Sequence, residues 1–176
     1  MNPAAAMSRR LTLMRHGQAE WKSGEAGDFS RALNRRGLAE AADVLKRYAD
    51  LPLRPDLIIT SPAQRALQTA ELAARALGLS AHQLLRDEKL YLAEPEDILQ
   101  VVRATGPRIA HLMLVGHNPG ITEFARQLAP ADALPTFETG ATCSMLVDIG
   151  NWNELRENLG REARYATAKR FLGFWR

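Results

Sequence analysis

The sequence predicts an α/β fold, a three-layer α/β/α sandwich in which helices cover both faces of a mostly parallel central sheet. Three observations lead to this prediction. Short apolar runs alternate with stretches of helical periodicity in a recurring strand–turn–helix pattern. The length of 176 residues suits one domain, and 46% hydrophobic with 24% charged residues is an ordinary globular composition. We expect one domain at residues 10–176 after a disordered leader at residues 1–9, with the start at either Met1 or Met7.

The first module combines a strand at residues 10–15 with a helix at residues 34–50. The strand prediction rests on a short apolar run flanked by arginines. The helix prediction rests on apolar side chains that recur at helical spacing and form one face. This face contains Leu38, Ala41, Ala42, Leu45 and Tyr48.

The second module starts with a buried strand at residues 56–60. A helix is expected directly afterwards, because Ser61 is a typical N-cap, Pro62 suits the first turn and Gln64 can complete a capping box. Gly78 is a good C-terminal stop, so the helix is expected to end there.

The third module is preceded by a helix at residues 95–105, which begins with acidic residues and ends at a glycine. The module itself consists of a fully buried strand at residues 110–115 and a helix that runs through Leu128. Residues 145–149 are expected to form a further strand. The tail is expected to add a short helix and an edge strand near residues 166–172.

Three of these strands end in sequences that are unusual for connecting turns. They are Arg15-His16-Gly17, Ser61-Pro62-Ala63-Gln64-Arg65 and Gly116-His117-Asn118-Pro119-Gly120. The carboxyl ends of parallel strands meet at one edge of a sheet, where ligands bind. Two arginines that converge there indicate an anion, because guanidinium forks match phosphate oxygens in pairs. The helix N-termini that follow add positive dipoles, so this edge is expected to form a phosphate cradle.

The histidines decide whether such a cradle is an enzyme or a binding module. A neutral imidazole in line with a bound phosphoryl group can attack phosphorus, and nearby arginines favour that neutral form. Gly17 would let the backbone turn sharply away from the strand beside His16. His117 is expected to hydrogen-bond a phosphoryl oxygen and stabilise its charge. This chemistry requires no metal and no cofactor.

Three motifs in this order resemble the signature of the histidine phosphatase superfamily, which also contains the cofactor-dependent phosphoglycerate mutases. They are Arg15-His16-Gly17, then Ser61-Pro62 with Arg65 and Gln68-Thr69-Ala70, then Gly116-His117-Asn118-Pro119-Gly120. The compact length, the stretch at residues 28–33 and Leu90-Tyr91 are most similar to the small SixA-type branch of phosphohistidine phosphatases. The resemblance covers about residues 11–149.

The resemblance implies a phosphoglycerate mutase-like fold and a two-step hydrolysis. It assigns His16 as the nucleophile that becomes phosphorylated. It assigns Arg15, Arg65 and His117 as the remaining members of the phosphate pocket. The implied partner is a phosphorylated protein, such as a phosphocarrier or response-regulator domain, or a small phosphorylated substrate.

Other residues beside the motifs are expected to help bind the substrate. Gly17, Ser61 and Asn118 flank the four pocket residues. Trp21 lies in a loop at residues 19–27, which either covers the site or is an ordinary exposed connection.

The sequence departs from larger members of the family at the residue that protonates the leaving group. Those relatives carry a glutamate there, within a longer motif that is absent here. Glu88, Glu94 and Glu96 lie in this region. Glu94 is the candidate acid, although Glu94 and Glu96 can equally be first-turn residues that stabilise a helix dipole.

The absence of a dedicated acid bears on the substrate. An alkyl alcohol leaves poorly unless it is protonated in the transition state. Phosphohistidine releases its imidazole easily once solvent protonates the other ring nitrogen. A small enzyme without a dedicated acid is therefore better suited to phosphoramidates, or to aryl phosphates in a test tube. The resemblance to the SixA-type branch implies that the substrate is protein phosphohistidine.

Two alternatives stay open at this point. Within the superfamily, the chain is a small-molecule phosphomonoesterase or mutase if one of the glutamates is a working acid. Outside catalysis, it is a phosphate-binding module that has lost turnover. The intact histidine pair argues against that loss.

Composition and spacing disfavour several other classes of protein. A net charge of +3 without a contiguous basic stripe, and only 6% aromatic residues, disfavour a nucleic-acid binder. No apolar run approaches the roughly 18 residues of a membrane span. The histidines lack the spacing of a zinc site, so no metal is expected. Cys143 is the single cysteine, which predicts no disulfide and a reducing, cytoplasmic location.

A few conspicuous residues are expected to be structural. His82 and His111 belong to no motif, and Cys143 lies in a strand-like stretch that suits the core. Arg31 is placed to form an ion pair with Asp28.

Overall fold

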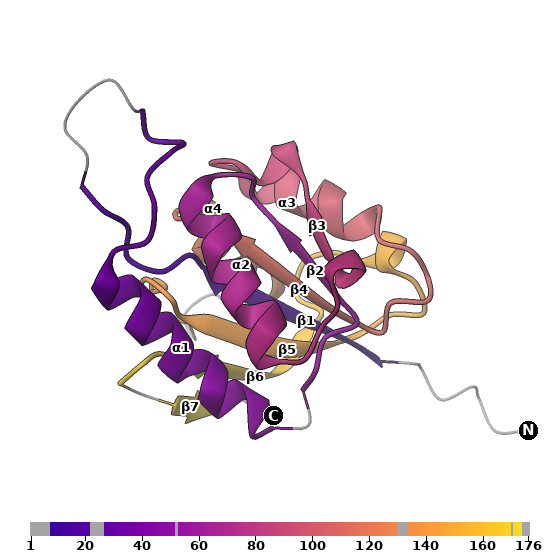
Figure 1. Cartoon of the computed structure of the whole chain (residues 1–176). Coiled ribbons are helices and arrows are strands. Elements are labelled where there is room, and N and C mark those ends of the chain that lie inside the picture. Colours follow the sequence, from indigo (N-terminus) through magenta and orange to yellow (C-terminus); the bar gives the residue numbers. More distant parts are fainter. Residues whose placement is uncertain (1–7, 22–26, 52, 130–133, 170, 174–176) are drawn as a thin grey trace, which may run out of the picture.

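A seven-stranded sheet with helices on both faces forms the molecule (Figure 1). The structure is a computed structural model, and it describes residues 8–21, 27–51, 53–129, 134–169 and 171–173. The strands are β1 (Ser8–Arg15), β2 (Leu57–Thr60), β3 (Leu84–Arg86), β4 (His111–Gly116), β5 (Thr142–Asp148), β6 (Gly160–Ala166) and β7 (Phe171–Gly173). The α-helices are α1 (Arg35–Ala49), α2 (Gln64–Ala76), α3 (Pro95–Arg103) and α4 (Gly120–Leu128). The short 3₁₀ helices are η1 (Ala81–Gln83), η2 (Glu88–Leu90) and η3 (Trp152–Glu154).

The strand order is β3-β2-β4-β1-β5-β6-β7, and it joins a parallel part to an antiparallel part. β1, β2, β3 and β4 are parallel to one another, as the recurring strand–turn–helix pattern predicts. β5, β6 and β7 extend the sheet with antiparallel pairs. The predicted α/β class and its layers are confirmed. β4 lies between β2 and β1, so the three strands that carry the motifs end side by side.

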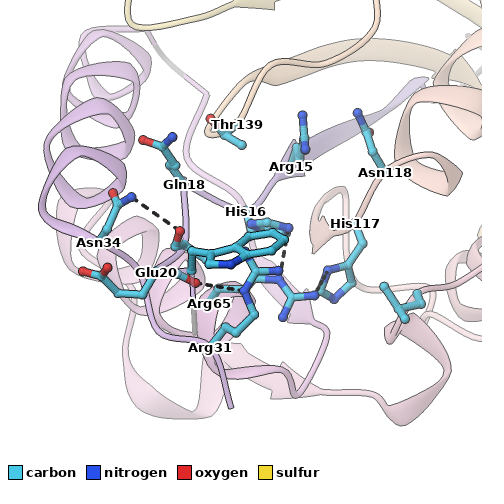
Figure 2. A pocket seen from close by; sticks show the side chains of 13 residues that line it. Arg15, His16, Gln18, Glu20, Arg31, Asn34, Arg65, His117, Asn118 and Thr139 are labelled. Atoms are coloured by element: carbon cyan, nitrogen blue, oxygen red, sulfur yellow. Dashed lines mark hydrogen bonds between the residues drawn. The ribbon is translucent and has the colours of Figure 1, made fainter. Parts of the chain in front are cut away.

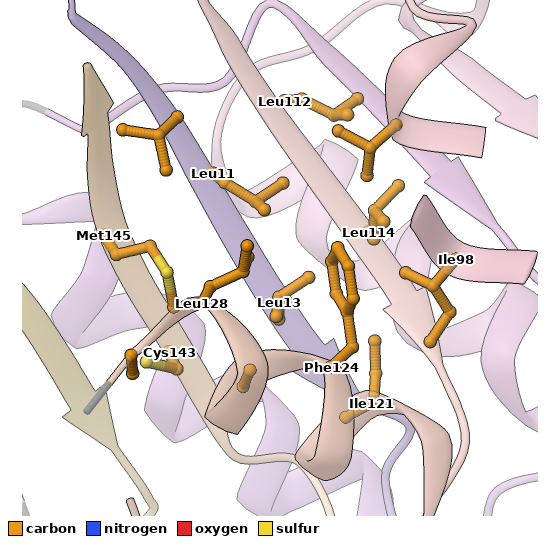
Figure 3. Packing of buried hydrophobic residues seen from close by; sticks show 14 of the residues in the cluster. Leu11, Leu13, Ile98, Leu112, Leu114, Ile121, Phe124, Leu128, Cys143 and Met145 are labelled. Atoms are coloured by element: carbon orange, nitrogen blue, oxygen red, sulfur yellow. The ribbon is translucent and has the colours of Figure 1, made fainter. Parts of the chain in front are cut away.

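Side chains of the central strands alternate between two separate core clusters. Leu11 and Leu13 of β1 face α3 and α4 and pack near Phe124 (Figure 3). Met14 of β1 and Val115 of β4 face the opposite way and pack against α1 and α2. This alternation of period two buries both faces of the sheet, which is why helices cover both.

Most predicted elements are confirmed to within a few residues. The helix predicted at residues 34–50 is α1, and the Oδ1 atom of its N-cap, Asn34, accepts the Gly37 N–H at 2.7 Å. The predicted stop after α2 is confirmed, because Gly78 has a left-handed φ of 68°. Cys143 is fully buried in β5, as expected.

The buried face of α1 differs from the predicted one. Leu38 is 42% exposed and Ala42 is exposed, whereas Val44, which the prediction left out, is buried. The physical reason is the close approach of the first turn of α1 to the loop after β1. A Cβ atom at Gly37 would lie 2.1 Å from the Gln18 carbonyl oxygen, so only glycine allows this contact.

Ser61 is not the N-cap of α2, and that prediction is wrong. The helix begins three residues later, with Ala63 at its cap position and no side-chain cap. The Oγ atom of Ser61 accepts the Ala63 N–H at 3.3 Å and lies 2.7 Å from Nε2 of His117. The serine therefore bonds a site residue instead of starting the helix.

The ends of the described chain and one edge of the sheet also differ. The strand predicted near residues 166–172 instead spans the connection between β6 and β7, a hairpin that the mixed polar sequence did not reveal. β3 was not predicted, because a strand of three residues gives too short an apolar run. β1 already begins at Ser8, inside the expected leader, while residues 1–7 lie outside the described residues. Within the described ranges, no helix is long and apolar enough to cross a membrane.

Candidate active site

Three parallel strands bring the predicted site residues to one edge of the sheet. Arg15 at the end of β1 is in register with Gly116 at the end of β4. The backbone N–H of His16 donates to the Gly116 carbonyl at 3.1 Å, and that of Ser61 donates to the Val115 carbonyl at 3.0 Å. The first residues after each strand therefore lie at the same height, as expected for parallel strand ends.

The imidazole of His16 has one committed nitrogen and one that faces the site. Its Nδ1 atom lies 2.7 Å from the carbonyl oxygen of Gly17, which can only accept a hydrogen bond. Nδ1 therefore carries the proton, and Nε2 carries the lone pair. The Nε–H of Arg65 donates to this Nε2 atom at 3.3 Å.

His117 lies beside His16, with 5.0 Å between the ring centroids (Figure 2). Its Nδ1 atom accepts from Nη2 of Arg65 at 3.3 Å, because a guanidinium can only donate. Its Nε2–H then donates to Oγ of Ser61 at 2.7 Å. The two imidazoles thus present one acceptor nitrogen each to the same guanidinium.

Both imidazoles are held in the neutral form. Burial lowers the pKa of His16 to about 4, although its bond to the Gly17 carbonyl acts in the opposite direction, and the nearby arginines lower it further. Burial also lowers the pKa of His117 to about 3, with further contributions from His16 and Arg65. At neutral pH the lone pair on Nε2 of His16 is therefore available.

Arg15 reaches the site from the end of β1. Its Nη1 atom donates to the Phe137 carbonyl at 2.8 Å, and Nδ2 of Asn118 donates to the same oxygen at 3.0 Å. Its Nε atom is buried and has no hydrogen-bond partner among the described residues. A buried donor without a partner is costly, so this atom favours an anion as its acceptor.

The backbone around His16 is fixed by close contacts. The Gly17 N–H donates to Oγ1 of Thr69 at 3.0 Å. A Cβ atom at Gly17 would lie 2.9 Å from the carbonyl oxygen of Gly37. Gly17 therefore allows the turn after β1 to pack closely on the first turn of α1.

A cavity of about 510 Å³ opens at this edge of the sheet (Figure 2). The predicted residues Arg15, His16, Arg65, His117, Asn118 and Trp21 line it. Seven further lining residues were not predicted from the sequence, namely Gln18, Ala19, Glu20, Arg31, Asn34, Leu92 and Thr139. Proximity to the first motif could have indicated those in the segment after His16, whereas Leu92 and Thr139 come from distant segments with no motif.

Some predicted site residues lie outside this lining. The carbonyl of Gly17 bonds the His16 ring and the hydroxyl of Ser61 bonds the His117 ring. Glu94 is the N-cap of α3, where its backbone N–H donates to Oδ2 of Asp97 at 3.2 Å. Neither Glu88 nor Glu96 lines the cavity. Among the described residues, the one acidic residue of the lining is Glu20, whose carboxylate is turned away from His16 (Figure 2).

The rim of the cavity carries the residues of the 28–33 stretch and the loop before it. Trp21 is 86% exposed, and the Arg31 guanidinium lies 5.6 Å from its ring centroid. Asp28 pairs with Arg31 at 2.9 Å, as the sequence predicted. Most of the loop, residues 22–26, lies outside the described residues.

The residues expected to be structural lie away from the cavity. His111 is buried at the start of β4, where its Nε2 atom lies 2.9 Å from Oγ1 of Thr12. His82 is exposed in η1, next to Ser80. Within the described ranges, no three His, Cys, Asp or Glu side chains are grouped as metal ligands.

A family model described as the histidine phosphatase superfamily (branch 1) matches residues 11–90 of the chain. An uncharacterized chloroplastic protein of Arabidopsis thaliana is 30% identical over 138 residues, which cover 74% of this chain and 63% of that protein. A 2,3-bisphosphoglycerate-dependent phosphoglycerate mutase of Rhizobium meliloti is 36% identical over 86 residues, 48% of this chain and 41% of the mutase. The chain thus spans less than two thirds of either relative.

Solved structures match over more of the chain. The putative phosphohistidine phosphatase SixA from Agrobacterium tumefaciens is 33% identical with a TM-score of 0.71, and the match covers 80% of this chain and 92% of that one. The protein histidine phosphatase SixA complexed with tungstate is 25% identical with a TM-score of 0.71, over 81% and 91% of the two chains.

Proposed function

The chain belongs to the histidine phosphatase superfamily, in its SixA-type branch, and from this membership and the site geometry we propose that it is a phosphatase that uses a phosphohistidine intermediate. The observation that carries the proposal is the orientation of the His16 ring, whose Nδ1 bonds the Gly17 carbonyl and whose Nε2 faces the cavity that Arg15 and Arg65 also line. A nucleophile and its anion-binding groups are thereby held together before the substrate arrives.

The first step transfers the phosphoryl group to His16. Its Nε2 atom attacks phosphorus, and the bond from phosphorus to the leaving group breaks with its electron pair, which solvent protonates. Arg15 and Arg65 donate to the phosphoryl oxygens and offset their charge. The phosphate charge also favours protonation of His117, which then donates from Nδ1 to a third oxygen.

The second step returns the enzyme to its starting state. A water molecule attacks phosphorus, the bond from Nε2 to phosphorus breaks, and inorganic phosphate forms. The arginines supply the positive charge that a metal ion supplies in other phosphatases, so the proposed reaction is independent of metal.

We further propose protein phosphohistidine as the substrate. The support is that the carboxylate of Glu20, the acidic residue among the described lining residues, is turned away from His16, whereas an alkyl leaving group needs a nearby acid. A phosphoramidate needs less assistance. The relatives with SixA structures are themselves described as phosphohistidine or protein histidine phosphatases. We expect a cytoplasmic location, consistent with the one, buried cysteine.

A second candidate is a phosphomonoesterase or mutase that acts on small molecules. The similarity to phosphoglycerate mutases over 86 residues favours it. The two candidates differ in whether alkyl phosphates are turned over.

The test compares three substrates under a metal chelator: a phosphohistidine-containing protein, an aryl phosphate and 3-phosphoglycerate. We expect rapid turnover of the first two and slow turnover of the third, with all activity lost in His16→Ala. Fast release of phosphate from 3-phosphoglycerate would contradict the substrate proposal and favour the second candidate. Loss of all activity in the chelator would contradict metal independence.

A further inference from the structure

Asp28 contacts the guanidinium of Arg65 along the edge next to the one that faces the two histidines, and Nη2 of Arg65 belongs to both edges. Its Oδ2 atom accepts from Nη2 of Arg65 at 2.8 Å, and its backbone carbonyl accepts from Nη1 at 2.6 Å. The Arg65 side chain is only 3% exposed, so these contacts are made by a nearly buried cation. The sequence indicated a partner for Asp28 only in Arg31, three residues away.

Two edges of the Arg65 guanidinium bond different partners. The edge formed by Nε and Nη2 faces Nε2 of His16 and Nδ1 of His117, both at 3.3 Å. The edge formed by Nη1 and Nη2 is bonded to Asp28. A guanidinium is planar, so anchoring one edge fixes the direction of the other.

Asp28 is itself held in place by two further donors. Nη1 of Arg31 donates to its Oδ1 at 2.9 Å, and the Tyr91 hydroxyl donates to its Oδ2 at 3.1 Å. Burial raises the pKa of this carboxyl, but the hydrogen bonds from Arg31 and Arg65 outweigh it and lower the pKa to about 2. Asp28 is therefore held as an anion, the form that pairs with the Arg65 guanidinium.

Tyr91 connects this group to the histidines. Its ring lies edge-on to His117, with 5.7 Å between centroids, and Phe29 packs against it at 5.1 Å. The 28–33 stretch and the segment after η2 are thus joined at the rim of the cavity.

We propose that Asp28 is a positioning residue, which turns the Nε/Nη2 edge of Arg65 towards the bound phosphoryl group. It acts through Arg65 and does not touch the substrate. This inference rests on the proposed function, since it assigns Arg65 to the phosphoryl oxygens. A displaced guanidinium would make one hydrogen bond to phosphate instead of two.

The test uses Asp28→Ala, with Asp148→Ala as the matched control. Both aspartate side chains are 43% exposed and pair with an arginine, but the partner of Asp148 is Arg161 on β6, which does not line the cavity as Arg65 does. With an aryl phosphate, we expect Asp28→Ala to lower kcat/KM by between about 10-fold and about 100-fold, since a misplacement of about 1 Å can cost about 100-fold. Asp28→Asn, which keeps an oxygen acceptor, is expected to recover part of this loss, and Asp148→Ala is expected to match the wild type.

Two readouts separate positioning from a general structural effect. Tungstate binding, measured by calorimetry at a temperature well below the unfolding transition of each variant, is expected to weaken in Asp28→Ala, and the unfolding temperature separately reports the loss of stability from the unpaired Arg65 cation. The Nε–H signal of Arg65 in the NMR spectrum, assigned by its absence in Arg65→Lys, is expected to exchange faster with water. Wild-type tungstate affinity and kcat/KM in Asp28→Ala would overturn the inference. If the wild type itself releases no phosphate, the proposed function fails instead, and the two failures are thereby distinct.

Discussion

His16 is poised by its hydrogen bonds to act as a nucleophile, because Nδ1 is committed to the Gly17 carbonyl and Nε2 is left as an acceptor. His117 has the complementary arrangement, with Nε2 committed to Ser61 and Nδ1 facing the guanidinium. The same guanidinium faces both acceptor nitrogens. A phosphoryl group that enters the site replaces these weak N–H···N contacts with charge-assisted bonds to oxygen.

The titration of the two imidazoles tests this arrangement. In the folded protein without phosphate, we expect NMR midpoints of about 4 for His16 and about 3 for His117. In the urea-unfolded chain both are expected near the ordinary value of 6.5. Saturating phosphate is expected to raise the midpoint of His117.

The same shifts have a consequence for stability. Both folded-state pKa values lie below the unfolded ones, so the unfolded chain binds more protons as the pH falls through this window. The free energy of unfolding should therefore fall between about pH 6.5 and about pH 4. A folded-state midpoint of His16 near the ordinary value would show that the nucleophile is charged in weakly acidic solution, contrary to our assignment.

The sequence predicted individual site residues unevenly. The sequence allowed the prediction of His16, Arg65 and His117, because each follows a buried strand and parallel strands end at one edge of the sheet. Asp28 pairs with Arg65 across 37 positions of sequence, between a loop and a helix, and no local pattern encodes that contact. Its pair with Arg31 was predictable because only three residues separate them.

The first turn of α1 determines where the His16 turn lies. Gly17 and Gly37 pack face to face, and the Asn34 N–H donates to the Gln18 carbonyl at 3.0 Å. The start of α1 is thus packed against, and hydrogen-bonded to, the segment that follows His16.

Gly37→Ala is expected to push these two segments apart. The new Cβ atom would lie 2.1 Å from the Gln18 carbonyl oxygen and 2.6 Å from its nitrogen. We expect a loss of about 1–3 kcal/mol in the free energy of unfolding, typical of overpacking. The activity should fall as well, because Gln18 and Asn34 line the cavity.

Gly106→Ala is the control for this substitution. No atom lies within 4 Å of a Cβ atom at Gly106, so urea unfolding and kcat/KM should match the wild type. If the two variants had the same free energy of unfolding, the segments α1 and the His16 turn could move apart without loss of stability, which would contradict this prediction.

Element boundaries were predictable where local rules decide them, such as the Asn34 cap of α1 and the glycine after α2. The buried face of α1 was not predictable in the same way. Periodicity shows that one face of the helix is apolar, but contacts with the rest of the fold decide which residues of that face are buried. The Ser61 prediction failed for a similar reason, since a long-range bond to His117 takes the hydroxyl that a cap would use. The short strand β3 and the β6–β7 hairpin carry too little periodic signal.

The whole molecule places the site through the order of its strands. Because β4 lies between β2 and β1, three segments far apart in sequence end side by side. Two core clusters hold the sheet between its helices and keep these ends in register. The parallel part was predictable from the recurring modules, and it is the part that carries the motifs. The antiparallel part contributes support such as the Phe137 carbonyl, which lies just before β5 and anchors Arg15.

The most direct test of a phosphohistidine mechanism is to trap the intermediate. The wild type, His16→Ala and the control His82→Ala would be mixed with an aryl phosphate in a metal chelator, quenched in alkali and analysed by intact mass. We expect the mass of one phosphoryl group on the wild type and on His82→Ala, lost on acid treatment, and none on His16→Ala. An adduct of equal amount on His16→Ala, or phosphate release by the wild type without any adduct on His16, would contradict the mechanism.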